Sequence, residues 1–267
     1  MSIIEVGHLS FSYLEVEVLR DLSFEVERGC FLAIAGPNGA GKSTLLNLLS
    51  GVLKPDSGSI KIDGSEVKSY STEALAREVA VVRQEFVPVF GFSVIEMVLM
   101  ARTPYYGPIG FESKADREIV NDALAATDTV EFARRRLGQI SGGERQRVFI
   151  ARALAQDTSI LLLDEPTSFL DLRHQVRIYD LLKKMQIEKD KTIVVVTHDI
   201  NLAAQYCDEA LLLGADTDYY KAAPQDVFSQ EKIEKVFGVT GFAGRVGREK
   251  FFLPLGKFAR DYRNKMS

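Results

Sequence analysis

A stretch of nine residues, GPNGAGKST at residues 36–44, constrains the fold of this chain more than any other part of the sequence. It matches the pattern Gly-x-x-x-x-Gly-Lys-[Ser/Thr], in which glycines let backbone N–H groups converge on phosphate oxygens. The apolar run CFLAIA precedes the loop, and the helical pattern KSTLLNLLSG continues from it. Phosphate binding needs a buried strand before such a loop and a helix N-terminus after it. The sequence therefore predicts a nucleotide-binding α/β fold.

The side chains of this phosphate loop have separate expected roles. Lys42 is expected to reach the β- and γ-phosphates, and the Ser43 hydroxyl is expected to ligate Mg²⁺. The phosphate loop therefore predicts a bound nucleotide and Mg²⁺. The loop residues predicted to bind the nucleotide are Gly36, Pro37, Asn38, Gly39, Ala40, Gly41, Lys42, Ser43 and Thr44.

Two carboxylates follow another apolar run, in ILLLDEP at residues 160–166. Asp164, at the expected end of a strand, can hold Mg²⁺ through its water shell. Glu165 is expected to point elsewhere and to orient or deprotonate the attacking water. Adjacent carboxylates also occur as solvated turn residues, but these two follow four apolar residues and precede a proline. We therefore expect both to be catalytic or metal-binding.

His198 ends a third apolar run, VVVTH. A lone histidine is usually structural. This one, however, is expected at the carboxyl end of a parallel strand, where open α/β sheets bind their ligands. The sequence therefore favours a hydrogen bond from His198 to the γ-phosphate.

Hydrophobic patterns divide the rest of the chain. Residues 3–27 alternate between apolar and polar side chains, which predicts antiparallel strands. Helical patterns dominate from about residue 72 to about residue 156, and the Pro- and Gly-rich stretch at residues 103–110 is expected to be a loop within them. The apolar runs at residues 159–164 and 192–198 enclose a helical stretch, which predicts a strand–helix–strand unit of a parallel sheet.

In the last part of the chain, residues 224–238 are expected to be helical. The stretch KFFLPLGKF, at residues 250–258, is expected to form a strand at the edge of the sheet. Together, the patterns predict an α/β fold with a parallel sheet core, an N-terminal antiparallel β-subdomain and an inserted helical subdomain.

Composition limits the possible partners. The formal net charge of −4 gives no reason to expect nucleic acid, which usually selects a basic face. Cys30 and Cys207 are the only cysteines, and they lie in no spacing that would suggest a metal site. No apolar stretch reaches about 18 residues, so other chains are expected to do any membrane spanning.

A second glycine-rich helix start, ISGGE, lies at residues 140–144. Ser141 and Glu144 have the spacing of a capping box, in which each side chain satisfies a backbone N–H group of the other residue. The same helix start could present its N–H groups to an anion. The residues leave both roles open, and the two roles are compatible.

The order of these motifs resembles the nucleotide-binding subunit of ABC transporters. The resemblance covers about residues 3–238 and rests on GPNGAGKST, Gln84, ISGGE, ILLLDEP, SFLD and His198. It implies an ABC ATPase domain at residues 1–240, with the helical subdomain at about residues 85–156. A short C-terminal extension would follow at residues 241–267.

The resemblance also assigns roles by position. Tyr13 is similar to the aromatic residue that stacks on adenine, although an ordinary strand tyrosine is the alternative. Gln84 is similar to the glutamine that senses Mg²⁺ and the attacking water, and Asp171 to the aspartate that links two sites across a dimer. The nucleotide-binding set would extend to Ser141, Gly142, Gly143 and Glu144, which in such proteins face the γ-phosphate held by the partner. Glu144 and Ile140 stand where Gln and Leu are commoner in the family.

The resemblance implies that the nucleotide is ATP, and it implies a homodimer with composite ATP sites at the cytoplasmic face of the cell membrane. It also implies two membrane-spanning permease subunits and, indirectly, a solute-binding protein. The stretches at residues 100–124 and 151–182 resemble ATPases that power uptake of metal chelates such as ferric siderophores, haem or cobalamin. A molybdate or tungstate importer remains an alternative, as does a non-transport ABC ATPase in iron–sulfur assembly.

Overall fold

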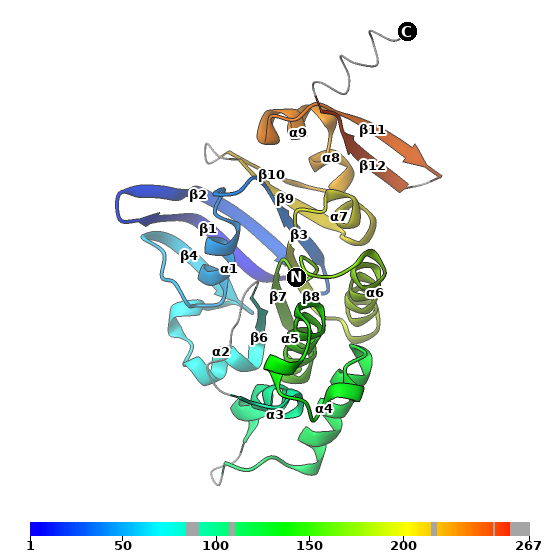
Figure 1. Cartoon of the computed structure of the whole chain (residues 1–267). Coiled ribbons are helices and arrows are strands. Elements are labelled where there is room, and N and C mark those ends of the chain that lie inside the picture. The colour runs from blue at the N-terminus through cyan, green and yellow to red at the C-terminus, as the bar shows by residue number, and fades with distance from the viewer. Residues whose placement is uncertain (84–90, 107–109, 215–217, 248, 257–267) are drawn as a thin grey trace.

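The computed structural model describes residues 1–256, except for 84–90, 107–109, 215–217 and 248. Its centre is a six-stranded sheet with the order β10-β9-β3-β8-β7-β6 (Figure 1). Neighbouring strands from β9 to β6 run parallel, and β10 is antiparallel to β9. The strands are β3 (Phe31–Ala35), β6 (Val79–Val82), β7 (Ile160–Asp164), β8 (Thr192–Val196), β9 (Glu209–Leu213) and β10 (Tyr219–Ala222).

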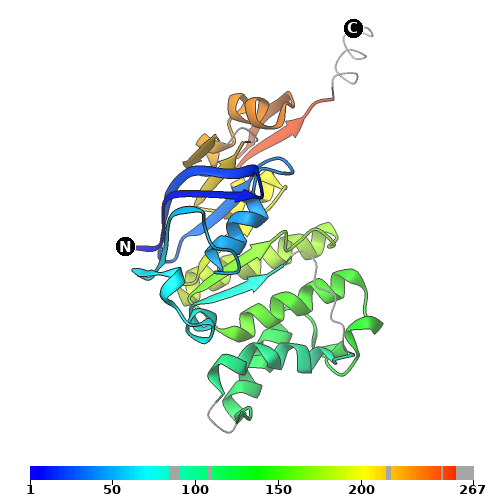
Figure 2. The same ribbon diagram turned by 90° about the vertical axis from the view of Figure 1, so that its left-hand side faces the viewer.

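A four-stranded antiparallel sheet covers one face of this core. Its order is β2-β1-β4-β5, and it confirms the antiparallel strands predicted for residues 3–27. The strands are β1 (Ser2–Tyr13), β2 (Val16–Glu27), β4 (Ser57–Ile62) and β5 (Ser65–Glu66). Figure 2 shows this sheet and α1 (Lys42–Leu49) together on one side of the central strands.

Residues of β3 alternate between two apolar cores. Phe31, Ala33 and Ala35 pack with the helices of one face, whereas Leu32 and Ile34 pack with α1 and the antiparallel sheet. Burial on both faces explains why the central strands are continuous apolar runs. The remaining α-helices are α2 (Thr72–Glu78), α3 (Val94–Leu99), α4 (Lys114–Ala126), α5 (Gly142–Gln156), α6 (Leu172–Lys189), α7 (Ile200–Tyr206), α8 (Pro224–Val227) and α9 (Gln230–Phe237).

The prediction of helical pattern from residue 72 to residue 156 is wrong at β6. Val79–Val82 forms a parallel edge strand beside β7, and Val82 pairs with Leu163. Four apolar residues between two helical stretches carry no periodicity of their own, and only the long-range pairing makes them a strand. The expected loop at residues 103–110 also differs, because a 3₁₀ helix spans Met100–Tyr105.

The tail differs from prediction in one respect. The helical stretch is confirmed as α8 and α9, but β12 (Glu249–Pro254) does not join the described part of the central sheet. It pairs with β11 (Gly241–Val246) in a separate two-stranded hairpin. A sequence pattern indicates that a stretch is extended, but it does not name the strand with which that stretch pairs.

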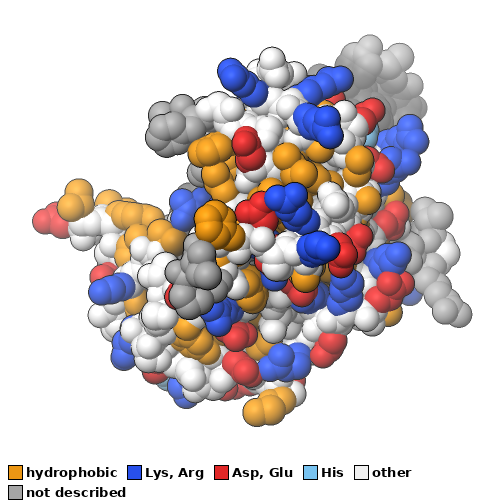
Figure 3. Space-filling view, turned by 90° about the horizontal axis from the view of Figure 1, so that it is seen from below, with side chains coloured by type: hydrophobic (Ala, Val, Ile, Leu, Met, Phe, Trp, Pro, Cys, Tyr) orange, Lys and Arg blue, Asp and Glu red, His pale blue; other side chains and the backbone are white. Residues whose placement is uncertain are grey.

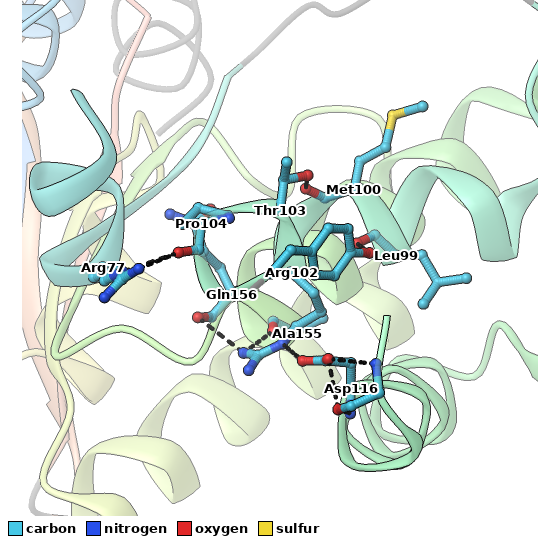
Figure 4. A network of polar contacts seen from close by, with 11 residues as sticks. Arg77, Leu99, Met100, Arg102, Thr103, Pro104, Asp116, Ala155 and Gln156 are labelled. Carbon is cyan, nitrogen blue, oxygen red and sulfur yellow. Dashed lines mark hydrogen bonds and ion pairs between the residues drawn. The ribbon is translucent and has the colours of Figure 1, made fainter. Parts of the chain in front are cut away.

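One buried guanidinium ties the helical subdomain together (Figure 4). Arg102 Nε donates to Asp116 Oδ1 at 2.8 Å, and Arg102 Nη1 donates to the carbonyl oxygen of Ala155 at 3.0 Å. The carbonyl belongs to the last turn of α5, and Asp116 belongs to the capping box that starts α4. Gln156 continues the link, because its amide donates to the carbonyl oxygens of Ala76 in α2 and of Val79 at the start of β6. This network therefore helps to set the orientation of α5, whose first turn carries Ser141.

We expect Arg102→Met to lower the free energy of unfolding by about 3 kcal/mol. Removing one partner of a buried ion pair costs about 3–5 kcal/mol, and Asp116 keeps its hydrogen bonds from Ser113. Urea denaturation measures the change. The control is Arg117→Met, which removes an exposed partner of Glu112 and should have a much smaller effect. Equal losses in the two variants would contradict the role of Arg102.

Candidate functional site

The candidate site lies where three neighbouring strands end. Ile34 of β3 and Asp164 of β7 both pair with Val196 of β8, so the carboxyl ends of the three strands lie side by side. The phosphate loop, the two carboxylates and His198 directly follow these ends. The structure thus brings together side chains that lie more than a hundred residues apart in sequence. This is the edge at which open parallel sheets bind their ligands.

Glycines shape the phosphate loop between β3 and α1. Gly36 has φ +153° and Gly41 has φ +86°, both in a region that L side chains rarely adopt. A Cβ atom at Gly36 would lie 2.4 Å from the carbonyl oxygen of Leu213. At Gly41, a Cβ atom would lie 2.9 Å from side-chain carbons of Val18 and Leu19. The loop therefore needs glycine at both positions, and the predicted strand, loop and helix are confirmed.

Lys42 is a buried cation at the start of α1. Its Nζ donates to the carbonyl oxygens of Gly36 and Pro37, each at 2.8 Å, so its charge lies inside the loop. Burial lowers the pKa of the Lys42 ammonium, and the nearby carboxylates of Glu165 and Asp164 oppose that shift. An ammonium held in this way is suited to bind phosphate oxygens.

Asp164 offers an acceptor atom suited to a cation. Its Oδ1 is buried and has no hydrogen-bond partner among the described residues. Burial raises the pKa of Asp164, while a hydrogen bond from the Ser43 hydroxyl opposes the shift. An unpaired carboxylate oxygen beside a hydroxyl fits Mg²⁺, which binds few protein oxygens and keeps several waters. The residues here therefore fit the predicted ion.

Glu165 follows β7 with a left-handed backbone conformation, at φ +47°. Its Oε1 lies 2.9 Å from Nε2 of His198, so the two side chains meet across the ends of β7 and β8. The sequence did not predict this contact, although it placed both residues at strand ends. Glu165 is mostly buried and His198 is partly exposed, with 17% and 44% of their side-chain surfaces accessible. The Glu165 carboxylate is thus held by His198, and it still lies at the open carboxyl edge of the sheet.

Ser141 begins α5 with the predicted capping box. The Ser141 N–H donates to Glu144 Oε2 at 2.7 Å, and the Glu144 N–H donates to Ser141 Oγ at 3.3 Å. The hydrogen bond from the backbone of Ser141 holds the pKa of Glu144 below its ordinary value. Among the described residues, no hydrogen bond or ion pair joins Ser141 to the phosphate loop of its own chain.

The loop that follows Glu165 packs against this helix start. A Cβ atom at Gly143 would lie 3.2 Å from the carbonyl oxygen of Phe169, so only a glycine allows this close approach without a shift.

Asp171 caps α6 after this loop. It accepts hydrogen bonds from the backbone N–H of His174 at 2.9 Å and from the His174 ring at 2.8 Å. The contact between Asp171 and His174 was not predicted, although the spacing of three residues is a signal for it.

One predicted residue lies apart from this cluster of side chains. Tyr13 is at the end of β1, half exposed, with its ring edge-on to Phe11 at 4.9 Å between centroids. Val18 and Leu19 of the paired strand β2 contact the phosphate loop at Gly41, so Tyr13 belongs to a hairpin beside that loop. Gln84 lies outside the described residues.

Comparison with known proteins identifies the family. The model described as "ABC transporter" matches residues 19–168, which is more than half of the chain. The chain belongs to the ABC transporter family. A second model, described as "AAA domain, putative AbiEii toxin, Type IV TA system", matches residues 133–204.

Relatives of this ABC protein include the petrobactin import ATP-binding protein FpuD of Bacillus anthracis. It is 39% identical over 234 residues, which are 88% of this chain and 86% of the relative. A solved metal-chelate type ABC transporter in an inward-facing conformation has a TM-score of 0.83 and 30% identity, and covers 97% of this chain and 99% of that one.

A solved dimer of the ATP-binding cassette MJ0796, in a post-hydrolysis state with ADP and Pi, has a TM-score of 0.74 and 30% identity. It covers 83% of this chain and 99% of that one. The predicted fold class is confirmed, and the chain is an ABC ATPase that binds ATP. No described helix of this ABC protein is both long and apolar enough to span a membrane.

We expect Asp164→Asn to weaken the contribution of Mg²⁺ to ATP binding about tenfold or more. The amide preserves the shape of the side chain, but it removes the buried negative charge. Calorimetric titration with ATP, with and without Mg²⁺, measures the effect. Binding without Mg²⁺ should change little and the melting temperature should not fall, because the variant no longer buries an unpaired carboxylate oxygen. Equal losses with and without Mg²⁺ would contradict metal binding by Asp164.

Proposed function

We propose that this chain is the ATP-hydrolysing subunit of an importer for metal chelates such as ferric siderophores, haem or cobalamin. The observation that carries the proposal is the meeting of Lys42, Asp164, Glu165 and His198 at the carboxyl edge of the sheet. Relatives support the choice of solute class, because they are named as import ATP-binding proteins for petrobactin, cobalamin, ferric enterobactin and hemin.

In this proposal, Lys42 and the backbone N–H groups of residues 36–44 bind the β- and γ-phosphates. Ser43 and Asp164, together with Gln84, would hold Mg²⁺, and the ion would neutralise charge on the phosphate oxygens. Glu165 accepts a proton from the water that attacks the γ-phosphorus, while ADP leaves with the bridging oxygen.

Two further residues complete the proposed site. His198 holds Glu165 in place and donates a hydrogen bond to the γ-phosphate. Tyr13 stacks on the adenine.

The proposed working unit is a homodimer. Ser141, Gly142, Gly143 and Glu144 make no described contact with their own phosphate loop, which supports a role toward a partner's ATP. A two-fold arrangement would place each α5 start opposite the phosphate loop of the other copy, with Asp171 linking the two sites. The solved dimer of a related cassette supports this assembly.

We further propose that the dimer binds two permease subunits at the cytoplasmic face of the cell membrane, and that a solute-binding protein delivers the chelate. Gln84 would lie at the permease contact.

Figure 3 views the chain from the end that carries α3 and α4, where charged side chains of both signs are interspersed with apolar ones. Met100 and Phe111 are exposed apolar residues of this subdomain. Co-purification of a polytopic membrane protein with the tagged chain would support the proposal, whereas a soluble scaffold alone would contradict it.

We expect Glu165→Gln to lower the ATPase rate by about 100-fold or more while ATP binding is retained. The amide cannot accept a proton from water, but it leaves the phosphate loop unchanged. Phosphate release and a nucleotide-binding titration measure the two properties. Hydrolysis at the wild-type rate would show that Glu165 is not the base.

We expect Ser141→Arg to bind ATP normally but to fail to dimerise. The long cation would fill the space between the start of α5 and the partner's nucleotide. Size-exclusion chromatography with ATP in the Glu165→Gln background measures dimerisation. The control is Asn121→Arg, which puts the same charge on the exposed surface of α4. If the Ser141→Arg chain dimerises like the control, Ser141 is only a helix cap.

A further inference from the structure

The C-terminal hairpin β11–β12 docks on the helix that directly follows His198. Strand β12 contacts α7, and the hairpin lies beside α7 and α9 in Figure 1. Nothing in the proposed hydrolysis uses this hairpin. Its attachment point is nevertheless only three residues from the histidine that contacts Glu165.

Asn201 makes the attachment with both ends of its amide. Its Nδ2 donates to the carbonyl oxygen of Phe252 at 3.3 Å, and its Oδ1 accepts the N–H of Phe252 at 2.8 Å. The side chain thereby pairs with both backbone polar groups of one residue of β12, as a neighbouring strand would. A paired amide of this kind fixes both position and orientation.

The same turn of α7 is joined rigidly to His198. Asp199 Oδ1 accepts the N–H groups of Asn201 and Leu202 at 3.0 and 2.9 Å. The N–H of Asp199 in turn donates to Thr197 Oγ1 at 3.0 Å. These bonds flank His198 on both sides, so a shift of Asn201 is transmitted to the backbone that carries the histidine.

Phe252 is the apolar anchor of the hairpin. Only 6% of its surface is accessible, and it belongs to the same core as Leu202 and Ile233. Its ring covers Gly241, where a Cβ atom would lie 2.1 Å from Phe252 Cζ. Cavities of about 450 and 510 Å³ lie beside Phe252, and both are lined by Ile200 and Asn201. Phe252 and the Asn201 amide therefore fasten β12 to α7, and β11 also contacts α9.

We propose that Asn201 is a positioning residue for ATP hydrolysis, through which the C-terminal hairpin holds His198 against Glu165. The proposal rests on the proposed function, because that function assigns His198 and Glu165 to the reaction. Its physical basis is that the fixed hairpin restrains the first turn of α7. Catalytic geometry is sensitive to such restraint, since a misplacement of about 1 Å can cost about 100-fold in rate.

The first test is Asn201→Ala in the full chain. We expect kcat for ATP to fall about three- to tenfold, with KM and nucleotide affinity unchanged, because a lost restraint is a smaller change than a full misplacement. The chain has only three histidines, His8, His174 and His198, so their ring signals in ¹⁵N-histidine NMR spectra can be assigned by substitution. The signal of His198 should shift while the other two remain. The control is Asn121→Ala, at an exposed position of α4.

The second test acts through the hairpin alone. Gly241→Ala places a methyl group where the Phe252 ring lies, so it should displace Phe252 and shift the same His198 signal. Gly256→Ala is the matched control, because a Cβ atom there meets nothing within 4 Å. Gly241→Ala should also lower kcat, and adding Phe252→Leu, which removes the ring atoms that the methyl group would meet, should restore part of it.

The outcomes separate this proposal from the proposed function. A His198 signal that is unchanged in both Asn201→Ala and Gly241→Ala overturns positioning by the hairpin, whatever the rate. A lower melting temperature with kcat unchanged per folded chain also overturns it, because the hairpin would then only stabilise the fold. A shifted His198 signal supports the coupling even if Glu165→Gln turns over normally, and in that case only the assignment of the base fails.

Discussion

The parallel pairing of β3, β8 and β7 is the constraint on which the rest of this structure depends. It aligns three strand ends, so that the phosphate loop, Asp164 and His198 meet at one edge although the chain separates them widely. Burial of these strands on both faces makes the alignment rigid, since alternate residues of β3 belong to two different cores. Glu165 reaches His198 because the chain turns left-handed immediately after β7. The chemistry proposed for this edge therefore begins with backbone pairing rather than with any one side chain.

Two parts of the chain outside the site help to position residues at this edge of the sheet. In the helical subdomain, Arg102 and Gln156 connect the end of α5 to α4, to α2 and to the start of β6. The same helix presents Ser141 at its other end, so its orientation decides where the glycines of residues 142–143 face. The C-terminal hairpin reaches α7 through Asn201, just after His198. In both cases, a buried or paired polar group fixes the position of one element relative to another, because such groups tolerate little displacement.

Much of the site could be predicted because its residues are bound to local structure. A phosphate loop needs glycines such as Gly36 at fixed spacing, and a capping box needs Ser141 and Glu144 three residues apart. Contacts between distant segments could not be predicted in this way. The bond between Glu165 and His198, the strand β6 and the pairing of β12 with β11 all depend on which segments become neighbours. A short sequence pattern does not specify which distant segment will become its neighbour. Tertiary packing also overrides a weak local pattern.

By itself, the sequence determined the family, the antiparallel strands of residues 3–27, and which residues follow the ends of β3, β7 and β8. These properties depend on local chemistry, namely apolar periodicity, glycine conformation and helix capping. Only the tertiary structure decided that Asp164 keeps a buried oxygen with no hydrogen-bond partner among the described residues, that Glu165 meets His198, and that the β11–β12 hairpin is fastened to α7. The reason is physical: desolvation and side-chain pairing are set by atoms that surround a residue in space, and most of those atoms come from elsewhere in the chain.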